Sequence, residues 1–256
     1  MGLDIYAGTL TRYYSKNWKS IVQQRAEMEG WGFEVIRQHD VPAEEEISVE
    51  EILEIMQQWC NVVADALSSS TGGSFEPWEE DNEKDYFTNK PDWCAWGTLL
   101  MYGACLFYDL PLPQTVKKDW DWTKDPLINR AIEDEERRWS LFSQGAEWWL
   151  PFNDSFSFRF QTPNGNEITM GTTAGLLYEL RTINELGWNA DEPTILGWVD
   201  TEGYPVDAEA GIDGAVKMIK IHDEYDTQSL ARFAFSILYQ AALFSEKHRV
   251  PIIMDY

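Results

Sequence analysis

The chain has little positive charge. Its 256 residues include 20 Lys and Arg residues against 44 Asp and Glu residues, so the formal net charge is −24 at pH 7. A protein that binds nucleic acid regardless of its sequence needs many Lys and Arg side chains against phosphate. An anionic membrane surface repels a chain of this charge. The composition therefore argues against nucleic acid and against membranes as partners.

Cysteine and histidine are also scarce. The chain has three Cys residues, Cys60, Cys94 and Cys105, and only three His residues. An odd number of Cys residues without paired spacing does not predict a disulfide framework, and no CxxC or HxxxH spacing predicts a structural zinc site. The first six residues lack the pattern of a secretory leader. We therefore expect a cytoplasmic protein without a bound metal or cofactor.

Recognisable catalytic motifs are missing as well. The sequence contains no GxSxG elbow, no phosphate-binding GxxxxGK[ST] loop and no GxGxxG run after a strand. Asp119, Asp121 and Asp125 have part of the spacing of a calcium loop, but Lys124 stands where such a loop needs Gly. These observations favour a protein that is not an enzyme, and they assign it to no family.

Long apolar segments are limited to one run, Trp93 to Tyr108. This run is shorter than a membrane-spanning helix, which needs about 20 apolar residues. We predict that it forms a helix buried in a protein core. Hydrophobic residues make up 44% of the chain and 13 residues are Trp, so a chain of this length can build a sizeable core and is not globally disordered.

The negative charge is concentrated in two blocks. Residues 40–85 hold 14 acidic residues and a single basic one, Lys84, and residues 190–213 hold seven acidic residues and no basic one. A charged surface that serves solubility alone does not require such clustering. The segregation favours an acidic face that docks a basic partner, although a set of solvated faces explains the same pattern.

The hydrophobic pattern predicts a helix-dominant α+β fold. Leu3 to Leu10 alternates as an N-terminal strand does, and residues 156–171 read as a β-hairpin around Pro163-Asn164-Gly165. Ser48 and Glu51 form a capping box at the start of a long amphipathic helix. Further helices are predicted to start at Asp125-Pro126, Thr173 and Asp226. We also expect a helical region that ends before Pro151, a hairpin at 195–206 and a helix at 208–221.

The chain is predicted to form one large domain over 1–256. Residues 68–92 begin with a Ser- and Gly-rich stretch and continue with carboxylates among aromatics, so we expect a mobile loop there. The aromatics of this loop either order on a partner or pin the loop to its own domain. The alternative organisation has two lobes, 1–67 and 93–256.

The favoured function is an acidic binding protein of the inhibitor or immunity type, which docks a basic protein partner by charge complementarity. Exposed Trp side chains often anchor such interfaces. The residues predicted to bind the partner are Glu50, Glu54, Trp78, Glu79, Glu80 and Asp81.

Two other hypotheses stay open. The first is an enzyme or small-ligand binder whose pocket is lined by carboxylates and Trp side chains. Its predicted pocket residues are Trp120, Asp121, Trp122, His222 and Asp223. The second is a structural or housekeeping role without a specific site.

Overall fold

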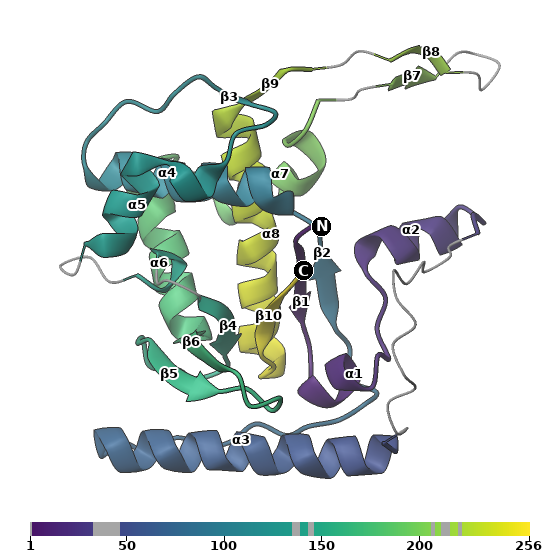
Figure 1. The fold of residues 1–256 in the computed structure, drawn as a ribbon, viewed down its shortest axis with the longest axis vertical. Coiled ribbons are helices and arrows are strands. Elements are labelled where there is room, and N and C mark those ends of the chain that lie inside the picture. Colours follow the sequence, from purple (N-terminus) through teal and green to yellow (C-terminus); the bar gives the residue numbers. More distant parts are fainter. Residues whose placement is uncertain are drawn as a thin grey trace.

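The computed structural model describes residues 2–32, 47–134, 139–142, 146–205, 208–210, 216–219 and 222–256. Within these ranges the chain forms helices around a mixed β-sheet, and helix is the dominant secondary structure (Figure 1). The predicted helix-dominant α+β class is confirmed.

Six strands form the central sheet, in the spatial order β2, β1, β10, β4, β6, β5. Their bounds are β1 Asp4–Ala7, β2 Phe87–Asn89, β4 Ala146–Leu150, β5 Phe158–Gln161, β6 Glu167–Thr172 and β10 Ile252–Asp255. Neighbouring strands are antiparallel except β4 and β6, which are parallel. Ile5 of β1 lies opposite Met254 of β10, so strands from the two ends of the chain are neighbours. A division into lobes 1–67 and 93–256 would cut through this sheet.

The helices and the smaller strands complete the described fold. The helices are α1 Leu10–Tyr14, α2 Ile21–Met28, α3 Val49–Thr71, α4 Asp92–Phe107, α5 Pro126–Glu133, α6 Thr173–Leu186, α7 Glu192–Thr201 and α8 Thr227–His248. Two short 3₁₀ turns are η1 Trp122–Lys124 and η2 Ser140–Phe142. Two strand pairs stand outside the central sheet: β3 Thr115–Lys117 with β9 Glu224–Asp226, and β7 Ala208–Ala210 with β8 Val216–Ile219.

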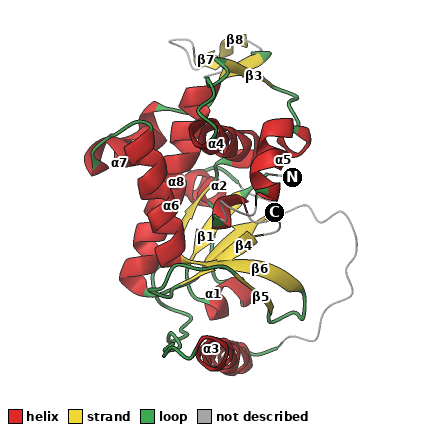
Figure 2. Ribbon diagram, turned by 90° about the vertical axis from the view of Figure 1, so that its left-hand side faces the viewer, coloured by secondary structure: helices red, strands yellow, loops and turns green. Residues whose placement is uncertain are grey.

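The two faces of the sheet pack against different helices. Side chains alternate along β1, so Ile5 and Ala7 enter one hydrophobic core while Tyr6 enters a second. The first core holds the buried faces of α4, α6 and α8, and the second holds the buried face of α3. Figure 1 shows α3 lying along one end of the molecule, and Figure 2 shows the same helix end-on. The sheet therefore separates α3 from the main helical layer.

Several predicted elements are confirmed. Ser48, Asp125 and Asp226 accept hydrogen bonds from backbone N–H groups in the first turns of α3, α5 and α8. The apolar run forms α4, which is buried over most of its length. Strands β5 and β6 pair as the predicted hairpin. These elements all carry their signal locally, in caps, turns or unbroken apolar spacing.

Three local predictions are wrong. Residues 195–201 belong to α7 rather than to a hairpin, because Asp191 caps a helix there whose first turn contains Pro193. The residues before Pro151 form strand β4, because Trp148 and Trp149 pair with β10 about a hundred residues later in the chain. The described residues within the predicted helix at 208–221 form β7 and β8.

The stretch expected to be a mobile loop is tied to the rest of the chain. Ser68 to Thr71 form the last turn of α3, which ends at Gly72 in the left-handed region with φ 73°. Beyond Gly72, Phe75 and Trp78 pack into the second core. The aromatic residues therefore hold this segment against its own chain, which contradicts a loop that becomes ordered only on a partner.

Candidate functional site

Helix α3 carries most of the predicted docking surface. Ser48 Oγ accepts a hydrogen bond from the Glu51 N–H at 3.2 Å, and Glu51 Oε2 accepts one from the Ser48 N–H at 3.0 Å. This predicted capping box fixes the start of a 23-residue helix. At about 1.5 Å per residue, the helix is about 35 Å long.

One face of α3 is buried and the opposite face is acidic. Met56, Cys60, Val63 and Leu67 enter the second core at helical spacing. The carboxylates on the exposed side are Glu50, Glu51, Glu54 and Asp65, and α3 contains no Lys, Arg or His residue. The predicted residues Glu50 and Glu54 therefore lie on the surface, together with two carboxylates that the prediction left out.

The segment after α3 runs back along the helix. The Gln57 side chain donates to the Trp78 carbonyl oxygen at 3.1 Å and accepts from the Glu80 N–H at 2.9 Å. These two bonds hold residues 78–80 beside the middle of the helix. Glu79, between them, has an exposed side chain. The fold thus brings a loop carboxylate next to those of α3.

Trp78 is not an exposed anchor. Its side chain is 1% exposed, and its ring makes edge contacts with Trp59 and Phe152. The indole N–H donates to Glu80 Oε1 at 2.8 Å, so the polar end of the ring is also satisfied inside the protein. The structure corrects the prediction, because this Trp stabilises the loop instead of facing a partner.

Glu80 is buried as well. One oxygen, Oε2, accepts hydrogen bonds from the N–H and the hydroxyl of Thr11, at 2.7 and 2.9 Å. The other oxygen accepts from Trp78, and the Cys60 thiol lies 3.8 Å from it. A carboxylate with this set of donors ties α1, α3 and the loop together. Glu80 is therefore a residue of the interior and not of the docking surface.

Asp81 is half-buried and holds a turn. Its Oδ1 accepts hydrogen bonds from the backbone N–H groups of Glu83 and Lys84, and its carbonyl oxygen accepts from the Thr9 hydroxyl. Such bonds are typical of Asp in tight turns. The charge of Asp81 is thus used within its own loop, and we leave this residue out of the docking surface.

Glu79 lies close to several cations. It lines a hollow of about 480 Å³ at the end of α8 together with Lys84, Lys247 and Arg249. Lys84 Nζ donates to the Glu79 carbonyl oxygen at 2.8 Å. Nearby positive charges offset part of the Glu79 charge. The purely acidic part of the surface is therefore the outer face of α3.

Two exposed aliphatic side chains stand among the α3 carboxylates. Ile55 is 46% exposed and Val62 is 56% exposed, and they are seven positions apart, so they lie on the same side of the helix. Carboxylates around exposed apolar residues resemble the polar rim and apolar centre of a protein interface. The spacing of these two residues is visible in the sequence, but their exposure depends on which face of the helix the core takes.

The alternative pocket residues make separate local contacts in the described part of the chain. Trp122 is half-buried against the first core, where Gly97 leaves room for its ring and Trp93 stacks on it. Asp121 caps η1 and lies 2.7 Å from Lys124 Nζ. The chain near Trp120 passes His222 and Asp223, because the Lys118 N–H donates to the Asp223 carbonyl oxygen at 2.8 Å.

Among the described contacts, no hydrogen bond or ring contact joins the Trp120-Asp121-Trp122 group to His222 or Asp223. Three hollows on the described surface, of about 530, 330 and 480 Å³, are lined by residues outside this set.

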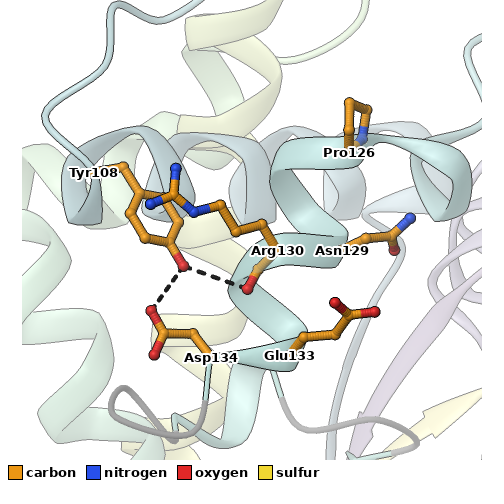
Figure 3. Close-up of a pocket in the computed structure, with 6 residues that line it drawn as sticks. All are labelled: Tyr108, Pro126, Asn129, Arg130, Glu133 and Asp134. Carbon is orange, nitrogen blue, oxygen red and sulfur yellow. Dashed lines mark hydrogen bonds between the residues drawn. The ribbon is translucent and has the colours of Figure 1, made fainter.

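A second hollow of about 530 Å³ lies beside α5 (Figure 3). The Arg130 guanidinium stacks on the Tyr108 ring at 3.8 Å from its centre, and the Tyr108 hydroxyl donates to Asp134 Oδ2 at 2.9 Å. The charged and aromatic groups of this hollow thus interact with one another across a shallow surface.

The interior also holds a second buried carboxylate, Glu179 of α6. Its two oxygens accept hydrogen bonds from the Ser140 N–H at 2.6 Å, the Ser140 hydroxyl at 2.9 Å and the Leu141 N–H at 3.1 Å. Burial raises the pKa of Glu179 to about 7, against the lowering effect of these donors. Trp149 donates to the Ser140 hydroxyl, so the group links α6, η2 and β4.

The thiols are poor nucleophiles. All three cysteines are free, and burial raises the pKa of Cys60, of Cys105 and, to about 11, of Cys94. A thiol needs a lowered pKa to react as a thiolate at neutral pH. Within the described ranges, no three His, Cys, Asp or Glu side chains are grouped to hold a metal ion. In the same ranges, no helix has both the length and the apolar character that crossing a membrane requires.

Comparison with known proteins finds no relative of this chain. No protein-family model matches the sequence, and searches of curated proteins and of solved structures return no match.

Proposed function

We propose that this protein is a cytoplasmic binding protein of the inhibitor or immunity type, and that it docks a basic protein partner on the outer face of α3. The observation that carries the proposal is the charge of one continuous stretch. From Ile47 to Glu83 the chain contains no Lys, Arg or His residue. Its acidic residues are Glu50, Glu51, Glu54, Asp65, Glu76, Glu79, Glu80, Asp81 and Glu83.

The position of these charges supports docking. Glu50, Glu51, Glu54 and Asp65 share one exposed helix, which lies along an end of the molecule with its outer side away from the fold (Figure 1). Within the described part of the chain, the exposed residues of this face are therefore open to a partner. Like charges placed this close together raise the local negative potential, which attracts a cationic surface from a distance.

Charge and apolar area make different contributions to such a contact. Complementary charge speeds encounter and fixes the orientation of the partner, whereas tight binding also needs buried apolar side chains. The exposed Ile55 and Val62 supply apolar area inside the acidic face. The three free thiols agree with the reducing compartment that the proposal assumes.

A crosslinking experiment tests the proposal directly. A photo-crosslinking amino acid is placed at Gln58, on the outer face of α3, and in a second variant at Tyr178, which is 60% exposed on α6. Both proteins are expressed in the source cells and irradiated. We expect the Gln58 variant to trap one basic protein and the Tyr178 variant not to trap it. A trapped protein that is acidic, equal trapping from both positions, or no trapping from Gln58 contradicts the proposal.

A further inference from the structure

Helix α3 has a second apolar stripe besides the one that enters the core. Its members follow one another at intervals of three, four, three and four residues, and they are Ile52, Ile55, Trp59, Val62 and Ala66. The first, third and fifth are half-buried at the border of the core, while Ile55 and Val62 are exposed. This is the spacing of the apolar seam of a coiled coil. From Ile52 to Ala66 the stripe, which we name the α3 seam, is about 21 Å long.

The α3 seam is fixed in place by the fold. Trp59, at its centre, donates from its indole N–H to the Gln161 carbonyl oxygen at 2.8 Å, and its ring contacts Trp148 and Phe160 edge-on. The seam therefore cannot turn inward without the loss of these contacts. Ile55 and Val62 lie one helical turn from Trp59 on the outer side, where 46% and 56% of their surfaces stay exposed.

Polar residues border the seam on its solvent side. Glu51, Gln58 and Asp65 each precede a half-buried seam residue by one position, so they repeat every seven residues beside it. In a coiled coil the residues at this place form ion pairs with the partner helix and select it. Here two of the three are carboxylates and none is basic. These positions therefore favour a partner helix with Lys or Arg opposite them.

From this arrangement we infer that the α3 seam binds an α-helix of a basic protein, with apolar residues at heptad spacing and with Lys or Arg beside them. The inference rests on the proposed function and names the element that docks. The partner helix lies along α3, its apolar side chains cover Ile55 and Val62, and its cations face Glu51 and Asp65.

The charges argue against a second copy of this chain as the occupant. Two α3 helices packed antiparallel through their seams would bring Glu51 of each near Asp65 of the other. Each chain also carries a net charge of −24, which opposes self-association. A basic helix removes both sources of repulsion.

Synthetic peptides supply the probe. The first peptide has about three heptads with Leu at the seam positions and Lys beside them. The second has the same composition in an order that breaks the three–four spacing, and the third keeps the heptads but replaces Lys with Glu. Binding to the full chain is measured by calorimetry or by the fluorescence anisotropy of a labelled peptide. We expect the first peptide to bind at least about tenfold more tightly than the second, and the third not to bind.

Substitutions in α3 separate the seam from the charge. Ile55→Glu with Val62→Glu adds two negative charges and removes the apolar side chains, and both positions are exposed, so the fold should persist. The matched control Gln58→Glu adds negative charge beside the seam and leaves the apolar stripe intact. We expect the double variant to lose binding of the first peptide, and the control to bind it at least as well as the wild type. Circular dichroism and urea unfolding show whether each variant is folded.

The outcomes distinguish the two proposals. If the first two peptides bind equally, and the double variant binds better than the wild type, the face acts by charge alone. The helix inference is then wrong while the proposed function stands. Failure of the first peptide to bind overturns the inference whatever the crosslinking shows. A dimer that forms through α3 and is abolished by the double variant would identify a second copy as the occupant, against the inference.

Discussion

The two buried glutamates show how much one residue can depend on distant segments. Glu80 receives hydrogen bonds from Thr11 and Trp78, and Glu179 receives them from Ser140 and Leu141. Each carboxylate joins pieces of chain that are far apart in sequence. Because these donors come from elsewhere in the fold, an acidic residue in the sequence looks the same whether it faces water or the core. The sequence therefore predicted Glu50 and Glu54 correctly as surface residues but not Glu80.

We expect Glu80→Ala to lower the free energy of unfolding by about 3 kcal/mol, since it leaves the Thr11 and Trp78 donors buried without an acceptor. The neighbouring Glu79→Ala is the matched control, because that side chain is exposed and a surface change should stay within about 0.5 kcal/mol. Urea unfolding of both variants measures the difference. Equal effects of the two substitutions would mean that Glu80 is not held as described.

Glu179 predicts a pH dependence of stability. The pKa of this carboxyl is about 7 in the folded protein and near 4.5 in an unfolded chain, so the folded state retains the proton over the interval between these values. Stability must then fall as the pH rises from about 4.5 to about 7, by up to about 3 kcal/mol from this group. Wild type and Glu179→Gln should be unfolded with urea at several pH values. The wild type should lose stability relative to the variant across this interval, and a constant difference would show that Glu179 does not titrate there.

At the scale of elements, local signals were sufficient for some segments and not for others. Helix α3 could be predicted because Ser48 and Glu51 cap it and an apolar stripe follows. Strand β4 could not, because Trp148 and Trp149 become a strand through pairing with β10. A sequence window contains neither the partner strand nor its register, so pairing of this kind cannot be seen locally.

Helix α8 offers a direct test of an element that was predicted and found. Ile237 and Leu238 are both fully buried in the first core, as the periodicity of the segment requires. Replacement of Leu238 by Ala should lower the free energy of unfolding by about 2–5 kcal/mol, because it leaves a cavity in the core. Gln228→Ala, at an exposed position of the same helix, should change it by less than about 0.5 kcal/mol. Thermal or urea unfolding reports both values, and a small effect at Leu238 would contradict the packing of α8.

At the scale of the whole molecule, the sequence shows which segment is acidic, but it does not show which of that segment's residues lie on the surface. The block at 40–85 is recognisable from its charge, but the fold divides its described part, residues 47–85, among an exposed helix, a turn and the interior. Glu50 and Glu54 remain on the outer face of α3, whereas Trp78 and Glu80 are used to attach the loop. The joining of both chain ends in one sheet could not be predicted, because β1 and β10 are separated by almost the whole chain.

The central claim is that the outer face of α3 attracts a basic partner through its carboxylates. One variant combines Glu50→Gln, Glu51→Gln, Glu54→Gln and Asp65→Asn. Its control combines Glu133→Gln, Glu185→Gln, Asp200→Asn and Asp223→Asn, four exposed carboxylates elsewhere. Each set changes the formal net charge from −24 to −20. Both proteins therefore carry the same net charge. They differ from each other only in which four carboxylates are neutralised.

The decisive measurement uses the partner that the crosslinking experiment identifies. Its association rate constant is measured with the wild type and with these two proteins, at low and at physiological salt. We expect the α3 variant to associate about tenfold more slowly than the wild type at low salt, because attraction between complementary charges speeds encounter. The difference should shrink as salt screens the charges, and the control should stay close to the wild type throughout. Equal slowing of both variants, or an association rate that responds neither to the α3 substitutions nor to salt, would contradict the account.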